Sequence, residues 1–303
     1  MAGTKRILNV LLCLFLCAPL FAAGGVGPDF LRISPPAKAA SFSGAYCAVP
    51  QDINSLLFNP AGIADLKLME ITLSHFASFA DTNYEYGALV IPLQNGAATS
   101  IGVFIDYTFD FVEIDEFGDE CGNVENYDAM GLISYAQPVF PGIYLGGTLK
   151  FFYSKLYVYD KIGFAFDAGG IIKIGSNPDT YGGISVQNIG WQQAYIKIAD
   201  TMPINIKAGV STSYDISQEV NIGASVDVNR LWIKDELPTL DLGAECTMFK
   251  ILCARAGYGF RHDAANLSIG IGVLLEKVKF AYAYQPFDTL GATHRISLDM
   301  LLE

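Results

Sequence analysis

The sequence predicts an all-β protein, a 14-stranded antiparallel transmembrane β-barrel with an N-terminal lumenal plug. Three observations lead to this prediction: an apolar leader, hydrophobic alternation with a period of two along most of the chain, and long connections that recur at alternate positions. Soluble β-sandwiches also alternate in this way. The number of segments favours the barrel, because strands of about 9–11 residues cross a bilayer at a tilt.

Residues 1–23 have the pattern of a secretory signal peptide. Lys5 and Arg6 precede an apolar run that ends in small residues. The run contains Pro19 and is not followed by basic residues, which favours a cleaved leader over a membrane anchor. We therefore expect an exported chain that is cleaved near residues 22 to 24.

The composition excludes several other classes of protein. The chain has 19 basic and 31 acidic residues, and this balance excludes nucleic acid as an expected partner. After the leader, no uninterrupted apolar run reaches the ~18 residues of a membrane-spanning helix. We therefore expect strands to cross the membrane, in contact with outer-membrane lipid, and we expect the protein in the bacterial outer membrane.

Residues 24–67 precede the first strand and form the predicted plug. A barrel of this size encloses more space than its inward side chains fill. The apolar stretch NSLLFNPAGIADL is broken by Asn59, Pro60, Ala61 and Gly62, and a central strand avoids proline and glycine. We expect these four residues to form a tight turn inside the barrel, in which the Asn59 side chain satisfies nearby backbone groups.

Residues 68–303 form the predicted barrel. In the segment VNIGASVDVN, apolar residues such as Val226 alternate with small or polar residues such as Asp227. We expect Val226 to face lipid and Asp227 to face the lumen, where Asp227→Asn should be tolerated. The same rule predicts fourteen strands, at 68–79, 83–93, 97–109, 126–138, 142–155, 161–173, 179–188, 203–213, 218–228, 238–248, 252–260, 264–274, 277–285 and 292–302.

The connections between these strands alternate in length. The even-numbered connections are short, and the long ones, at 110–125, 189–202, 229–237 and 286–291, are all odd-numbered. Outer-membrane barrels have short periplasmic turns and longer external loops. We therefore expect the long connections to lie outside the cell.

The run KAASFSGAYCAVPQDINSLLFNPAGIADL resembles the N-terminal hatch of FadL-type long-chain fatty-acid transporters. In that hatch an Asp precedes an NPAG stretch by a short apolar spacer, and here six residues separate Asp52 from Asn59. The ending GATHRISLDMLLE is similar to the last strand of PorV-like and treponemal FadL-related outer-membrane proteins. The resemblance implies a plug or gating role for Asp52, Asn59, Pro60, Ala61 and Gly62.

The same resemblance implies a function. The expected function is passive outer-membrane uptake of hydrophobic molecules, with fatty acids as the expected ligand, through a channel gated by the plug. The alternative is a PorV-like scaffold or shuttle that binds secreted proteins. The chain departs from the family in lacking a long hydrophobic landing insert and in ending Leu301-Leu302-Glu303 instead of in an aromatic residue. Outer-membrane assembly machinery is an expected partner, and no cofactor is expected.

An enzyme is not expected from the histidines. The chain has only His75, His262 and His294. Ser74 precedes His75, but neighbours in a strand point to opposite faces, so they cannot form a nucleophile and base pair.

Two further features leave alternatives open. The acidic connection 110–125 supplies oxygen ligands for a cation, although a solvated external loop is favoured. Cys246 and Cys253 flank a turn. A two-residue turn would set the cysteines opposite each other for a disulfide, whereas the favoured three-residue turn points them to opposite faces.

Overall fold

The computed structural model describes residues 27–79, 81–108, 112–124, 126–233, 236–261, 266–287 and 291–302. The predicted leader, the first three residues of the predicted plug and His262 lie outside the described residues.

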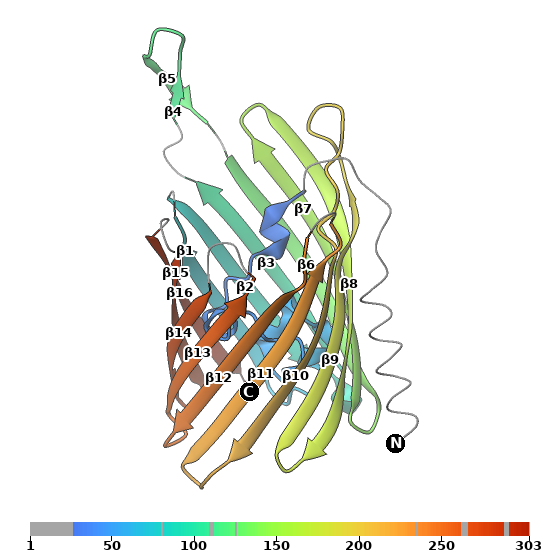
Figure 1. The fold of residues 1–303 in the computed structure, drawn as a ribbon. Coiled ribbons are helices and arrows are strands. Elements are labelled where there is room, and N and C mark those ends of the chain that lie inside the picture. Colours follow the sequence, from blue (N-terminus) through green and yellow to red (C-terminus); the bar gives the residue numbers. More distant parts are fainter. Residues whose placement is uncertain are drawn as a thin grey trace.

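Fourteen antiparallel strands close into one barrel (Figure 1), which confirms the predicted fold class. Neighbours in the ring are neighbours in the chain, except that β3 pairs with β6 and that β1 completes the ring on β16. The barrel strands are β1 (Met69–Ala77), β2 (Thr82–Pro92), β3 (Ala98–Thr108), β6 (Asn126–Phe140), β7 (Ile143–Leu156), β8 (Tyr159–Ser176), β9 (Asp179–Gln192), β10 (Asn205–Asp215), β11 (Val220–Leu231), β12 (Thr239–Met248), β13 (Leu252–Phe260), β14 (Leu267–Leu274), β15 (Val278–Phe287) and β16 (Gly291–Leu302).

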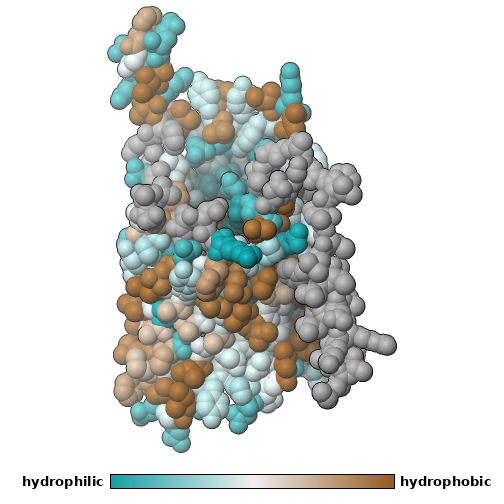
Figure 2. All heavy atoms as spheres, viewed as in Figure 1, coloured by the Kyte–Doolittle hydropathy of each residue, from teal (hydrophilic) through white to brown (hydrophobic). Residues whose placement is uncertain are grey.

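Side chains alternate between the lumen and the outer surface of the barrel. On β11, Asp227 is fully buried whereas Val226 is 43% exposed. Along the other strands the buried positions carry many serines, threonines and charged residues, and the exposed positions are largely aliphatic or aromatic. Figure 2 shows hydrophobic side chains spread over the wall. An apolar exterior around a polar lumen is the pattern of an outer-membrane barrel, and the protein is located in the bacterial outer membrane.

The helices are all short. They are the 3₁₀ helices η1 (Asp29–Arg32), η2 (Ile53–Leu57), η3 (Pro60–Ile63) and η4 (Gln94–Gly96), and the α-helix α2 (Ala37–Ser41). No helix in the described part of the chain has the length and apolar character needed to cross a membrane.

The predicted start of the loop 189–202 is wrong, because β9 continues to Gln192. A β-bulge interrupts the strand there: the register with β8 shifts, and Asn188 has a positive φ of 61°. Gln187 and Asn188 are both buried, so the alternation changes phase and Trp191 faces outward. A change of phase looks like the end of a strand in the sequence.

The predicted loop 110–125 also contains regular structure. A hairpin of β4 (Val112–Ile114) and β5 (Glu120–Asn123) projects beyond the rim of the barrel (Figure 1). Its turn is held by Asp115, whose carboxylate accepts hydrogen bonds from the backbone N–H groups of Phe117 and Asp119. These strands are too short to give a hydrophobic alternation.

The turn between β12 and β13 has three residues, as favoured from the sequence. Met248 pairs with Leu252, and Thr247 faces Cys253 across the turn. Cys246 and Cys253 are both free thiols.

Candidate functional site

The N-terminal segment, residues 27–67, lies inside the barrel (Figure 1). Its backbone is hydrogen bonded by strands from different sides of the ring. Ser297 Oγ on β16 accepts from Ala37 N at 2.8 Å, and Ser185 Oγ on β9 donates to Phe58 O at 2.8 Å. Ser211 Oγ on β10 donates to Ala48 O at 2.7 Å. A segment held from several sides of a closed ring occupies its lumen.

Asp52 and Asn59 begin two successive 3₁₀ helices. The Asp52 carboxylate accepts from Asn54 N at 2.8 Å at the start of η2, and Asn59 Oδ1 accepts from Ala61 N at 3.1 Å at the start of η3. Pro60 stands at the first position of η3, where its missing N–H is not needed. Asp52 N donates to Gly62 O at 3.1 Å, which ties the two turns together. Asp52 and Asn59 therefore cap two successive helices, and the six-residue spacing between them is the length of the first helix and its end.

The Asn59 side chain also joins the segment to the barrel wall. Its Nδ2 donates to Cys47 O at 2.7 Å within the segment. The same amide group lies 3.2 Å from Gly170 O on β8 and 3.3 Å from Ile184 O on β9. Asn59 is fully buried, so these contacts satisfy a group whose isolation from water is otherwise costly.

Gly62 is needed for close packing. A Cβ at this position would overlap Ser55 Oγ and would lie 2.8 Å from Val49 O. Its φ is not in the left-handed region, so the turn depends on the small size of Gly62 and not on an unusual backbone conformation.

A partly buried ion pair organises the segment internally. Lys38 Nζ lies 2.5 Å from Asp52 Oδ2, and Tyr46 OH donates to the same oxygen at 2.9 Å. Burial alone would raise the pKa of Asp52, but the Lys38 ammonium holds that pKa well below its ordinary value. Burial alone would lower the pKa of Lys38, and the Asp52 carboxylate holds that pKa well above its ordinary value.

Asp227 is an anchor that the sequence did not reveal. Its Oδ2 accepts hydrogen bonds from Tyr46 N at 2.8 Å and from Cys47 N at 2.7 Å. The prediction that Asp227 faces the lumen is confirmed. The sequence led us to expect that Asp227 could be replaced without much effect. It could not reveal these hydrogen bonds, because they join positions 180 residues apart in the chain.

Glycines on the inner wall leave room for backbone and side-chain atoms of the N-terminal segment. A Cβ on Gly146 of β7 would lie 2.6 Å from Ala61 N, and one on Gly169 of β8 would overlap Asn59 Oδ1. The same close approach occurs at Gly183, Gly243, Gly257 and Gly270, on β9, β12, β13 and β14. The wall is therefore shaped to this segment.

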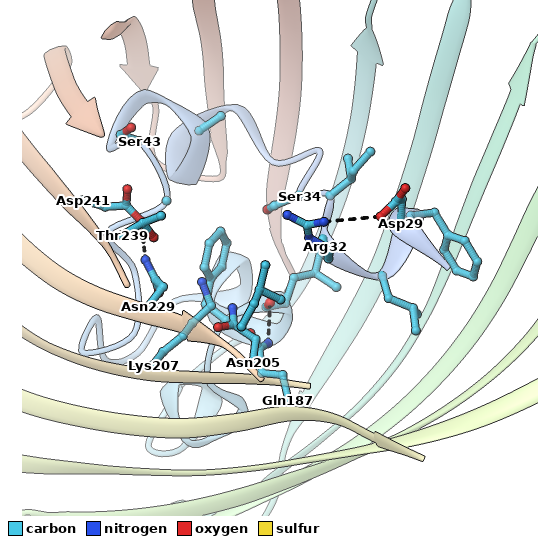
Figure 3. A pocket seen from close by; sticks show the side chains of 18 of the residues that line it. Asp29, Arg32, Ser34, Ser43, Gln187, Asn205, Lys207, Asn229, Thr239 and Asp241 are labelled. Carbon is cyan, nitrogen blue, oxygen red and sulfur yellow. Dashed lines mark hydrogen bonds and ion pairs between the residues drawn. The ribbon is translucent and has the colours of Figure 1, made fainter. Parts of the chain in front are cut away.

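Between the segment and the long connections lies a cavity of about 540 Å³, which we call the vestibule. One wall is polar and comes from β9 to β12; Figure 3 shows Gln187, Asn205, Lys207, Asn229 and Asp241 on this side. Figure 2 shows a recess toward the end of the barrel that carries the β4–β5 hairpin, with hydrophilic residues in and below it.

The opposite wall of the vestibule is mainly aromatic and apolar, and it also carries Gln285 and Arg295. Phe76, Tyr84, Met130 and Phe287 line it from β1, β2, β6 and β15, together with Phe30 of the N-terminal segment. The connection after β9 folds back here, because Gly27 N donates to Thr201 O at 2.9 Å and Met202 is buried in the same cluster as Phe30.

An apolar groove of about 630 Å³ lies on the outer surface of the same side of the barrel. Its sides are exposed residues that include Val103, Phe151 and Trp191. Its floor is a layer of three buried side chains, Phe104, Met130 and Phe152, which we call the Phe104 layer. Met130 lines both the vestibule and the groove.

Phe30 covers the inner side of the Phe104 layer. Its ring centroid lies 6.0 Å from that of Phe104 and 5.6 Å from that of Phe152. The N-terminal segment therefore supports the inner face of the barrier between the vestibule and the groove.

The histidines and acidic residues have other partners. His75 Nδ1 lies 2.8 Å from Glu85 Oε1 on the outer face, and Ser74 Oγ lies 2.7 Å from Ser297 Oγ in the lumen. His294 contacts Tyr282 OH at 2.8 Å. Among the described residues, no group of three or more His, Cys, Asp or Glu side chains is placed to hold a metal ion.

No family model and no curated protein matches the chain. Solved structures do resemble it. The toluene transporter TbuX of Ralstonia pickettii has 11% sequence identity over 88% of this chain and 98% of that chain, with a TM-score of 0.58. The toluene transporter TodX of P. putida has 8% identity over 88% and 98%, with a TM-score of 0.59. The monoaromatic hydrocarbon channel CymD has 13% identity over 90% and 98%, with a TM-score of 0.57. At these identities the likeness shows a shared fold, and that fold is the FadL-type barrel which the hatch resemblance implied.

Proposed function

We propose that the protein is a passive outer-membrane uptake channel for hydrophobic molecules, gated by its N-terminal plug, with long-chain fatty acids as its ligands. The observation that carries this proposal is that Met130 lines both the vestibule and the outer groove. The aromatic wall of the vestibule and the apolar groove share one side chain as their boundary. A hydrophobic ligand that passes this boundary moves along apolar side chains from the vestibule to the outer groove.

The route begins at the end of the barrel with the long connections. The ligand enters the vestibule and lies against the apolar wall at Phe76 and Tyr84. Displacement of Phe30 removes the support of the Phe104 layer, and rotation of Met130 opens the way into the groove and the bilayer. Neither an energy source nor a reacting group is required, because the ligand moves down its concentration gradient.

The N-terminal segment blocks the alternative route along the barrel axis. It is bonded to several strands and packs against glycines from β7 to β14, which supports its role as a plug. We infer that Asp52 and Asn59 keep the plug in one conformation, so that only the part around Phe30 moves during passage.

The choice of ligand rests on two kinds of likeness. The solved structures are titled as toluene transporters and monoaromatic hydrocarbon channels, which supports a hydrophobic ligand. The fatty-acid assignment comes from the hatch resemblance. The PorV-like and treponemal part of the resemblance rests on the last strand alone, which is also the segment that outer-membrane assembly machinery would recognise.

The test is uptake into proteoliposomes that contain the purified protein. Labelled oleate is supplied outside, and the parent is compared with Met130→Trp, in which a larger ring fills the boundary. Ile133→Trp is the matched control, because Ile133 lies on the same strand but faces the lipid with 56% exposure. We expect Met130→Trp to lower uptake at least tenfold and Ile133→Trp to leave it unchanged. Equal uptake by all three proteins would refute the route.

The alternative function is a scaffold or shuttle for secreted proteins, and one observation favours it. The β4–β5 hairpin projects beyond the barrel and carries Phe117, which is 82% exposed at its turn. Replacing the hairpin with a short Gly-Ser linker separates the two functions. Loss of bound secreted proteins with unchanged oleate uptake would support a scaffold, and unchanged binding would exclude the hairpin as the docking element.

A further inference from the structure

A buried arginine without an acidic partner lines the vestibule. Arg295 on β16 is 7% exposed. Its Nη1 donates to Gln285 Oε1 at 3.0 Å and lies 3.3 Å from Thr293 Oγ1, whereas its Nε has no hydrogen-bond partner. Among the described residues, no carboxylate forms an ion pair with this guanidinium.

Other buried cations of the lumen have acidic partners. Lys150 Nζ lies 2.7 Å from Asp167 Oδ2, and Arg255 Nε lies 2.5 Å from Glu245 Oε2. A charge held away from water is costly unless an opposite charge and hydrogen bonds compensate it. An anion bound from outside the chain would compensate the unpaired charge of Arg295.

The free edge of Arg295 has the shape for a carboxylate. Because Nη1 is already bonded, Nη2 and the buried Nε are the guanidinium nitrogens without a hydrogen-bond partner in the described structure. These two nitrogens form a planar fork that donates two parallel hydrogen bonds to the two oxygens of one carboxylate. A neutral alcohol offers a single oxygen and no charge.

The surroundings of Arg295 also provide a place for an apolar tail. Its Cζ lies 3.8 Å from the ring centroid of Phe76, which stacks on Tyr84 at 4.7 Å. Tyr84 in turn lies 6.0 Å from Phe104. This row of aromatic rings leads from the guanidinium to the Phe104 layer, where the outer groove begins.

We propose that Arg295 is the specificity-determining residue of the vestibule and that it selects ionised hydrophobic acids over neutral molecules of the same size. The carboxylate binds at Arg295, and the tail lies along Phe76 and Tyr84 toward the Phe104 layer. This assignment rests on the proposed function, since it identifies the chemical class of the molecule that enters the channel.

The test is equilibrium binding of a matched pair of probes, labelled octanoate and labelled 1-octanol, to the full-length protein in lipid nanodiscs at pH 7. Empty nanodiscs correct for partition into lipid. The variants are Arg295→Gln, Arg295→Lys and, as a control outside the vestibule, Lys250→Gln in the exposed turn between β12 and β13. Heat-modified migration in gels and far-UV circular dichroism establish that each barrel is folded.

We expect Arg295→Gln to weaken octanoate binding at least tenfold and to leave 1-octanol binding within twofold of the parent. Arg295→Lys should recover part of the octanoate affinity, and Lys250→Gln should change the binding of neither probe. If Arg295→Gln weakens both probes equally or neither of them, the assignment is overturned while the proposed function stands. If the parent protein binds neither probe, the proposed function and the assignment both fail.

Discussion

Asp227 on β11 accepts a hydrogen bond from the backbone N–H of Cys47 at 2.7 Å, so one lumenal carboxylate holds the N-terminal segment against the wall. The same oxygen accepts from Tyr46 N at 2.8 Å. Hydrogen bonds from backbone N–H groups to a carboxylate are stronger than those to a neutral acceptor. The N-terminal segment and the lumenal face of β11, which look independent in the sequence, are thus joined in one structural unit.

The first prediction concerns this anchor. Asp227→Ala should weaken the docking of the N-terminal segment by about 1–3 kcal/mol, because two buried N–H groups lose their acceptor. Asp227→Asn should have a smaller effect, since an amide oxygen still accepts. The measurement is the rate of protease cleavage within residues 44–50, with Val226→Ala on the outer face as the control. Parental cleavage rates in Asp227→Ala would show that the carboxylate does not anchor the segment.

The second prediction concerns Asn59. Asn59→Ala removes the cap of η3 and the contacts to Cys47 O and the strand carbonyls. We expect larger or noisier single-channel conductance in planar bilayers with an intact barrel, because the strands pair without this segment. Asn221→Ala is the control, since Asn221 lies at the start of β11, where it is partly exposed and its Nδ2 donates to Asp215 Oδ1. If conductance, uptake and protease sensitivity all match the parent, Asn59 has no gating role.

The third prediction concerns the inner wall. In Gly169→Val the new side chain would overlap Asn59, so the N-terminal segment must move. Gly223→Val provides a matched control, because the nearest atoms to its Cβ are at ordinary contact distances of 3.7 and 3.9 Å. Hydrogen exchange of residues 44–63 should accelerate in the first variant alone. Equal protection in both variants would contradict the close fit described for this wall.

The fourth prediction concerns pH. The pKa of Asp52 is lowered in the folded protein, so its contribution to docking is present above the ordinary carboxyl pKa and is lost as the pH falls below it. The pKa of Lys38 is raised, so its contribution is present below the ordinary lysine pKa and is lost as the pH rises above it. We expect steady conductance between these limits and noisier channels below about pH 4. Asp52→Asn should abolish the acid transition, and a transition that persists in this variant has another origin.

The fifth prediction concerns orientation. Cys121 is an exposed free thiol in the β4–β5 hairpin. A membrane-impermeant maleimide should therefore label it on intact cells, and Cys121→Ser should remove this signal. Ser217→Cys, in the short turn between β10 and β11, is introduced into the Cys121→Ser protein and should be labelled only after the outer membrane is permeabilised. The reverse result would invert the assigned topology.

The fourteen strands could be predicted because a period of two is imposed directly by the geometry of a wall with lipid on one side and a lumen on the other. The continuation of β9 could not be, since the bulge at Asn188 shifts that period. The capping role of Asn59 follows from local chemistry. The roles of Asp227 and Arg295 could not be predicted, because they depend on distant residues that face them. The alternation of apolar and polar residues indicates only that both side chains point inward.

The position of the N-terminal segment has a consequence for assembly. The ring closes at a seam between β1 and β16, the first and last strands of the barrel. The segment leads directly into β1, and it contacts β16 where Ser297 Oγ accepts from Ala37 N and where Asp299 accepts from Asn54 Nδ2. A ring sealed beforehand would have to admit the segment by threading. Packing the segment against both strands while the seam is open would avoid that step and would couple the filling of the lumen to the sealing of the ring.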